Sequence, residues 1–369
     1  MITRIYIHNF RTLVDFTVKL SEINLFMGPN GCGKTSVFDA VRLLQSFLRG
    51  DCRVDKAFEK RDITCWAQKS EMRIELDLSL PEGDFTYAIH IEYVNYENDC
   101  LIKEESLYVD GKPLFQREQN YVQTYTDDHV AESPFPVGLS LSALVMIAVS
   151  PDTKKLAAFK YQTGLLVVAG INPFAMEANS REEDQTLDND MRNFTSWYRK
   201  LMAKNPEKVG DVVKALRNGP MPDFLYYSFD DAGQDVKTFN VHFSAPNASD
   251  YKMNFGRLSA GQKVLIVLYI LMFGVKGDGI CLFLDEPENF VMLREIQPWL
   301  AEFRDVHGTA FRQLTLISHH PHVIDEVGVS DSQWFFRDNG GATQLKDYTP
   351  ILDDSPLALS EHVAMGNFE

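Results

Sequence analysis

The chain has 369 residues, 45% of them hydrophobic and 12% aromatic, which is the composition of a globular protein with one large domain and an insertion, or with two domains. The net charge of −16 argues against general electrostatic adhesion to nucleic acid, and no apolar run is long enough to span a bilayer. The five cysteines form no C-x-x-C pair, and the first residues lack the layout of a signal peptide. We therefore expect a cytoplasmic protein with no membrane partner.

The first informative stretch is residues 28–35, Gly-Pro-Asn-Gly-Cys-Gly-Lys-Thr, which fits the phosphate-binding pattern G-x-x-x-x-G-K-[ST]. The mostly apolar stretch 23–27 before it predicts a short buried strand, and residues 36–48 after it have the apolar spacing of a helix. The glycines allow successive N–H groups to curl around one anion at the N-terminus of that helix. Lys34 would reach the terminal phosphates and Thr35 would bind Mg²⁺, whereas the alternative is a chance glycine-rich turn.

The surrounding chain predicts three segments. Residues 1–125 form a strand-rich lobe, with alternating strands at 5–7, 16–20, 73–80, 85–91 and 105–109. Residues 126–224 form a helical insertion, with a buried apolar stretch at 139–149, helices at 188–202 and 209–216, and a solvated acidic loop at 181–190. Residues 225–369 form a second lobe, in which strands resume.

The second informative stretch is residues 257–263, Arg-Leu-Ser-Ala-Gly-Gln-Lys, which precedes a strongly apolar helix at 264–273. A Ser-x-Gly turn at the start of a helix presents a hydroxyl, backbone N–H groups and the positive end of the helix dipole, which suits phosphate. The alternative is that Ser259 is an ordinary helix N-cap.

Two further apolar runs end in polar groups. Residues 280–284 predict a buried parallel strand that ends in Asp285 and Glu286, where Asp285 would coordinate Mg²⁺ and Glu286 would polarise the attacking water. Residues 314–317 predict another buried strand, after which His319 is a candidate contact to the γ-phosphate. The alternatives are a surface acidic pair and a structural histidine. Residues 333–337 and 342–345 predict a hairpin.

Four motifs in this order resemble the ATPases of the ABC superclass, within them the SMC, RecF and OLD-like branch. Residues 28–35 look like Walker A, 258–262 like the signature motif, 282–286 like Walker B with its catalytic glutamate, and His319 like the H-loop histidine. The resemblance covers about 1–125 and 251–345, and includes Asn9-Phe10-Arg11 and the hairpin near the end. It departs from the family at 288–295, where a His-Pro step is usual, and Gln116, Gln119 and Gln123 are weak candidates for the Q-loop glutamine.

The resemblance implies an α/β fold, a P-loop ABC-type ATPase head in which a mixed, strand-rich lobe and a parallel-sheet lobe carry a helical insertion. It implies that ATP and Mg²⁺ are bound and that two copies dimerise around the nucleotide, each signature motif facing the partner's Walker A. The residues implied in nucleotide binding are Arg11, Asn30, Gly31, Gly33, Lys34, Thr35, Ser36, Ser259, Gly261 and Gln262. Thr35 and Asp285 are implied as metal ligands, and Lys34, Glu286 and His319 as catalytic residues.

Several hypotheses for the biological role are consistent with the sequence. The first is a nucleotide-driven switch in a homodimer or higher oligomer that controls a separate effector protein, for example a nuclease, in bacterial anti-phage defence. The 24 residues after Leu345 are too few for the Toprim nuclease of OLD proteins, so we expect chemistry on nucleic acid to belong to another polypeptide. We expect the effector to dock on residues 126–224, where the acidic loop 181–190 suits a basic partner.

The alternatives are DNA repair or a DNA clamp of the RecF type, a transporter subunit, and a scaffold that binds nucleotide without hydrolysis. Residues 1–50 carry six basic and three acidic side chains, which leaves a local DNA-binding face open. The 222 residues between Walker A and the signature motif disfavour a transporter subunit. The presence of both Glu286 and His319 disfavours a scaffold without hydrolysis.

Overall fold

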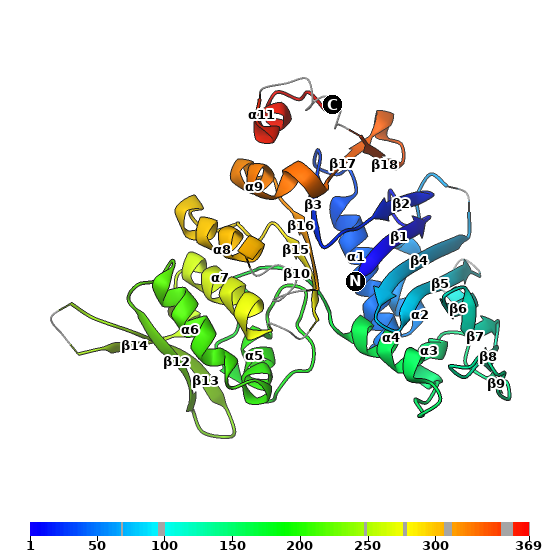
Figure 1. The fold of residues 1–369 in the computed structure, drawn as a ribbon, viewed down its shortest axis with the longest axis horizontal. Coiled ribbons are helices and arrows are strands. Elements are labelled where there is room, and N and C mark those ends of the chain that lie inside the picture. Colours follow the sequence, from blue (N-terminus) through cyan, green and yellow to red (C-terminus); the bar gives the residue numbers. More distant parts are fainter. Residues whose placement is uncertain are drawn as a thin grey trace. The chain divides into compact units, whose positions relative to one another are not determined.

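The computed structural model describes residues 1–67, 69–94, 100–246, 249–275, 279–305, 312–347 and 357–368 (Figure 1). The chain forms two compact units, one of Met1–Leu166 with Ser330–Glu369 and the other of Val167–Val329. These boundaries differ from the predicted divisions at 125 and 224, and the three-segment division stays a prediction. Within the described residues, no helix is both long enough and apolar enough to cross a membrane.

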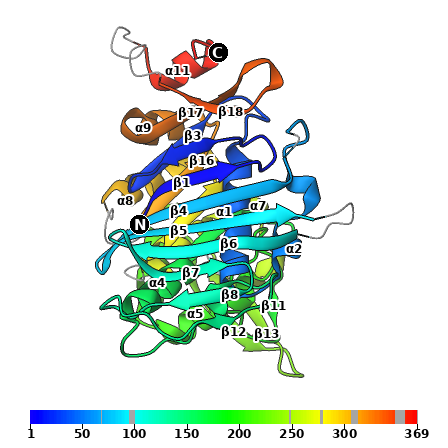
Figure 2. The same cartoon turned by 90° about the vertical axis from the view of Figure 1, so that its right-hand side faces the viewer.

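The first unit contains an antiparallel sheet whose strands run side by side in Figure 2. In β4 and β5 buried residues alternate with more exposed ones, because successive side chains of a strand point to opposite faces of the sheet. This confirms the strand-rich character predicted for the first part of the chain. The strand order is β2 (Phe16–Lys19), β1 (Ile2–His8), β4 (Glu71–Leu80), β5 (Gly83–Tyr93), β6 (Cys100–Val109), β7 (Lys112–Glu118), β8 (Tyr121–Thr124) and β9 (Phe135–Pro136).

The same unit contains a shorter set of strands beside the glycine-rich loop. β3 (Ile23–Met27) pairs in parallel with β17 (Ser332–Arg337), and β17 pairs antiparallel with β18 (Thr343–Lys346). Helix α1 (Lys34–Arg49) follows the loop and buries the apolar positions that its spacing predicted. The remaining short helices are α2 (Val54–Ala57), η1 (Lys60–Asp62), α3 (Ala143–Met146), α4 (Lys154–Gly164), η4 (Asp338–Gly340) and α11 (Leu359–Ala364).

The predicted burial of residues 139–149 is wrong for about half of the stretch. Ala143, Leu144 and Ile147 are buried, but the side chains Leu139, Leu141, Val145, Met146 and Val149 are exposed. Polar contacts to the sheet hold the backbone here, since fully buried Arg117 donates to Gly138 O (3.0 Å) and Leu141 O (2.5 Å) and pairs with buried Glu105. Hydrogen bonds, more than apolar burial, therefore fix this segment.

The second unit combines a parallel strand pair with a small antiparallel sheet. β15 (Cys281–Asp285) and β16 (Gln313–Ile317) pair in parallel, as their apolar sequences predicted. β11 (Asn179–Ser180), β13 (Lys237–Phe243) and β12 (Phe224–Asp231) form the antiparallel sheet, with β14 (Tyr251–Asn254) paired to β13. The other elements are β10 (Leu166–Gly170), α6 (Lys208–Asn218), η2 (Phe255–Arg257), α7 (Ala260–Tyr269), the π-helical turn η3 (Ile270–Gly274), α8 (Leu293–Asp305) and α9 (Pro321–Asp331).

The helix predicted from residue 188 begins later, as α5 (Phe194–Lys204). Met191 has a φ of 56°, which is outside the helical region, and the Asn193 side chain accepts a hydrogen bond from Asp188 N (2.8 Å). This local bond gives the backbone a turn in place of a helix. The acidic loop 181–190 follows β11 directly. Its residues lie in turns and bends and belong to no helix or strand.

Candidate functional site

The loop between β3 and α1 depends on its glycines, as the phosphate-binding pattern predicted. Gly28, Gly31 and Gly33 have φ values of 136°, 76° and 105°, which side chains rarely tolerate. A Cβ on Gly28 would lie 2.0 Å from Phe335 O, and one on Gly33 would lie 2.3 Å from Thr343 Oγ1. The motif therefore requires glycine both for backbone conformation and for close approach.

Lys34 lies at the start of α1 and is buried within the loop. Its ammonium donates to Gly28 O at 2.6 Å and to Pro29 O at 3.0 Å, so the cation is held over the loop itself. The N-cap residue of α1 is Gly33, which has no side chain to cap the helix, and the N–H groups and the helix dipole at this end favour an anion. This arrangement fits a triphosphate. Thr35 and Asn30 are exposed and Ser36 is half-buried beside it.

The hairpin of β17 and β18 braces this loop from residues far along the chain. Arg337 Nη1 donates to Gly31 O (3.2 Å) and Thr343 Oγ1 donates to Cys32 O (2.8 Å). Thr12 also lies 2.8 Å from Thr343, oxygen to oxygen. The sequence predicted the hairpin but not these roles, because the pairing of β17 with β3 is what brings Arg337 and Thr343 to the loop.

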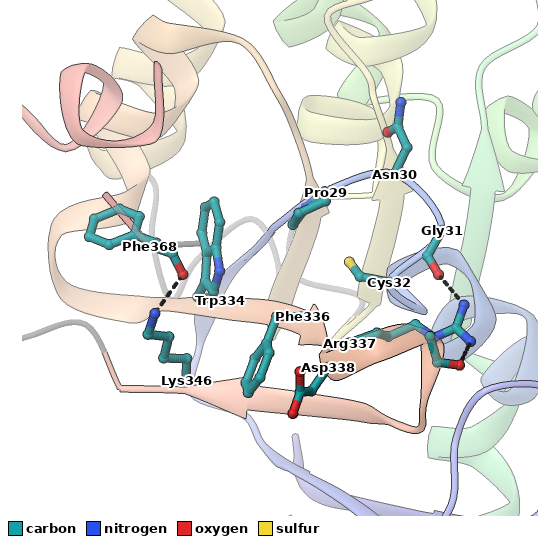
Figure 3. Close-up of a pocket in the computed structure, with 11 residues that line it drawn as sticks. Pro29, Asn30, Gly31, Cys32, Trp334, Phe336, Arg337, Asp338, Lys346 and Phe368 are labelled. Atoms are coloured by element: carbon teal, nitrogen blue, oxygen red, sulfur yellow. Dashed lines mark hydrogen bonds between the residues drawn. The ribbon is translucent and has the colours of Figure 1, made fainter. Parts of the chain in front are cut away.

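A cavity of about 640 Å³ lies against residues 29–32 of the loop. Figure 3 shows the residues that line it. The two cationic side chains among its lining residues contact main-chain carbonyls: Arg337 donates to Gly31 O, and Lys346 Nζ donates to Phe368 O (2.8 Å). Phe368 in turn packs edge-on against Trp334, with ring centroids 5.0 Å apart. The cavity wall thus joins the loop, the hairpin and the segment that follows α11. It is lined by Pro29, Asn30, Gly31, Cys32, Trp334, Phe336, Arg337, Asp338, Gly340, Lys346 and Phe368.

Arg11 is held by two carboxylates of the first unit. Its guanidinium contacts Asp39 at 2.5 Å and Asp62 at 3.3 Å, and its backbone has a φ of 51°. Burial alone would lower the pKa of Arg11, but these two carboxylates raise it above its usual value. The contact of Arg11 with nucleotide stays a prediction. In this structure the side chain is already held by two ion pairs.

In the second unit the signature residues begin α7 with a capping box. Ser259 Oγ accepts from Gln262 N (3.2 Å), and Gln262 Oε1 accepts from Ser259 N (3.1 Å). A Cβ on Gly261 would lie 2.8 Å from Phe290 O, so glycine here permits close approach of the segment after β15. The N-cap interpretation of Ser259 is confirmed, and its phosphate contact stays a prediction.

The carboxylates at the end of β15 lie beside the loop that follows β16. Residues 281–284 are buried, Asp285 and Glu286 are half-buried, and Glu286 N donates to Ile317 O at 2.9 Å. Glu286 has a φ of 46°, and its Oε2 accepts from Asn289 Nδ2 (2.8 Å). His319 Nε2 lies 4.0 Å from Glu286 Oε1, and each side chain is 41% exposed. Within this unit the fold brings the two predicted catalytic residues together.

Residues 1–132 match the family of AAA ATPase domains, a class of ATP-binding domain. Along the chain, this match includes the glycine-rich loop and most of the antiparallel sheet.

Over 122 residues the chain is 27% identical to the OLD nuclease of Thermus scotoductus (strain ATCC 700910 / SA-01). That alignment covers 31% of this chain and 20% of the relative, so the chain spans about a fifth of that nuclease. The SMC head domain from Thermotoga maritima superimposes with a TM-score of 0.49 and 13% identity, over 94% of this chain and 99% of that one. The first two comparisons agree with the predicted resemblance to OLD-like ATPases. The parallel and antiparallel strands, together with their helices, confirm the mixed α/β fold class.

Proposed function

We propose that this chain is a Mg²⁺-dependent ATP hydrolase that acts as a nucleotide-driven switch. The observation that carries the proposal is the pair of Glu286 and His319 at the ends of two parallel strands, in a chain that also has a complete phosphate-binding loop. In this proposal Lys34 and the loop N–H groups hold the phosphates, and Thr35 and Asp285 hold Mg²⁺. Glu286 orients the attacking water and His319 contacts the γ-phosphate.

Replacement of Lys34 by alanine tests the nucleotide site directly. We expect ATP affinity to fall by at least about tenfold, because the ammonium that offsets the phosphate charge is lost, and one charge-assisted hydrogen bond contributes about 1.5–3 kcal/mol. Isothermal titration with Mg-ATP measures the change. Lys160→Ala is the matched control, since that helix ammonium also donates to a main-chain carbonyl, Ile147 O (2.6 Å), but not to one of the loop. Unchanged affinity in Lys34→Ala would contradict the phosphate-site assignment.

The switch is proposed to work in a homodimer. Ser259, Gly261 and Gln262 would face the partner's bound ATP, so that nucleotide becomes part of the interface and hydrolysis removes it. Ser259 is exposed at the N-terminus of α7, where a helix dipole can act on an anion.

Pairing of basic residues weighs against a DNA clamp as the role. Arg4 contacts Glu75 and Asp77 at 2.5 and 2.6 Å. Arg42 and Arg49 are also paired, with Asp39 (3.3 Å) and Asp51 (3.2 Å). Because these partners neutralise the local positive charge that left a DNA-binding face open, a protein effector, as in anti-phage defence, is the role we favour.

The acidic loop 181–190 is the proposed docking site for that effector. Burial raises the pKa of Asp188, and the nearby negative charges of Asp190 and Asp184 raise it further. The carboxylates of the loop therefore lie close enough to repel one another. Such a cluster would steer a basic protein surface. The exposed apolar side chains of residues 139–149 are a second surface on which a protein partner could bury area.

Neutralising the loop should weaken the effector complex without changing ATP turnover. We expect Glu182→Gln/Glu183→Gln/Asp190→Asn to raise the Kd for a co-expressed effector by about tenfold at low salt, and by less at high salt because salt screens the steering charges. Surface plasmon resonance measures this. The control neutralises three exposed acids elsewhere, Glu82, Asp84 and Glu118. Equal affinities in the two variants would refute docking at this loop.

A further inference from the structure

Glu288 carries a buried carboxyl group between the loops that follow β15 and β16. The residue is 8% exposed, and its Oε1 accepts a hydrogen bond from the hydroxyl of Ser318, which is fully buried. Among the described residues, Glu288 Oε2 has no hydrogen-bond partner. Burial raises the pKa of Glu288 despite the bond from Ser318, and the charge of Glu286 acts in the same direction. Burial of a carboxyl group with one oxygen unpaired costs folding free energy, which indicates that Glu288 has a role beyond packing.

The bond to Ser318 lies where the strand pairing stops. The parallel ladder of β15 and β16 ends at Asp285 and Ile317, and Glu286 N extends it by one bond, to Ile317 O (2.9 Å). Beyond that bond, the Glu288–Ser318 contact joins the two loops side chain to side chain. Ser318 Oγ also accepts from His320 N at 3.0 Å. The same hydroxyl therefore links Glu288 to the backbone on the far side of His319.

We propose that Glu288 is a positioning residue for ATP hydrolysis: through Ser318 it holds the His319 loop so that His319 stays beside Glu286. This inference rests on the proposed ATPase function. Without the carboxyl oxygen, the Ser318 hydroxyl loses its acceptor and the loop is no longer tied beyond the ladder. A displacement of about 1 Å in a catalytic group can cost about 100-fold in rate, whereas the phosphate-binding loop is untouched.

The test compares Glu288→Ala, Ser318→Ala and the double variant, with the wild-type chain and Glu286→Gln measured alongside. We expect each single alanine to lower kcat by about 10- to 100-fold, with KM for ATP within about twofold of wild type. Since both residues act through one bond, the double variant should lose no more than the worse single variant. Glu288→Gln keeps an oxygen acceptor for Ser318 and should recover most of the rate.

A matched control separates positioning from local stability. Glu295 is a carboxylate of the same segment, whose Oε2 accepts from Met292 N (3.1 Å) at the start of α8, and Glu295→Ala should leave kcat within about twofold because the bond it loses does not join the two loops. Wild-type kcat in Glu288→Ala, multiplied losses in the double variant, or no recovery in Glu288→Gln would each overturn the role of Glu288. Absence of turnover in the wild-type chain would refute the ATPase proposal itself, and the role of Glu288 with it.

Discussion

Replacement of Glu286 by glutamine is expected to give a protein that binds Mg-ATP normally and hydrolyses it at least about 100-fold more slowly, the usual contribution of a positioned general base. The amide cannot take a proton from the attacking water, but its oxygen can still accept from Asn289 Nδ2, now at 2.8 Å from Glu286 Oε2. The geometry around residue 286 should therefore survive the change, and the loss should appear in kcat alone.

Phosphate release at saturating ATP measures the turnover of this variant, and isothermal titration measures its affinity for ATP. Glu295→Gln is the control. It makes the same change from carboxylate to amide in the same segment, but farther along the chain from the end of β15. Wild-type turnover by Glu286→Gln would show that residues 282–286 are not a Walker B motif. Lost ATP binding would instead indicate that Glu286 supports the fold.

Ser259→Arg is expected to leave ATP binding by the single chain intact and to abolish both hydrolysis and ATP-dependent dimerisation. Ser259 is exposed and begins α7, so a long cation there would fill the space that the proposal assigns to the partner's phosphates. Light scattering of the Glu286→Gln protein with ATP should show a rise in mass, and the added Ser259→Arg change should remove it.

Ser259→Ala separates this steric and electrostatic block from the loss of the helix cap. Removing the hydroxyl deletes the bond from Gln262 N and costs about 1 kcal/mol of stability, but it adds no bulk. It should retain most of the turnover and the mass increase. If Ser259→Arg still dimerises with ATP, or if Ser259→Ala fails as completely, the composite site is the wrong explanation.

The local elements could be predicted because their causes are local. A short, mostly apolar stretch predicts β3 or β15, and the spacing of apolar positions predicts the buried face of α1. The prediction failed at 139–149 and at 188–193, where hydrogen bonds with Arg117 and Asn193 decide the conformation. Apolar periodicity carries no information about such bonds.

The sequence by itself determined which groups are candidates for the proposed chemistry: a glycine-rich loop, the lysine that ends its motif, and two carboxylates after a buried strand. Only the tertiary structure decided what holds these groups. Arg337 and Thr343 brace the loop from about 310 residues away, and Glu288 reaches Ser318 across 30 residues. Such pairs are decided by which strands lie side by side, because strand pairing depends on packing of the whole unit and not on the spacing of residues along the chain.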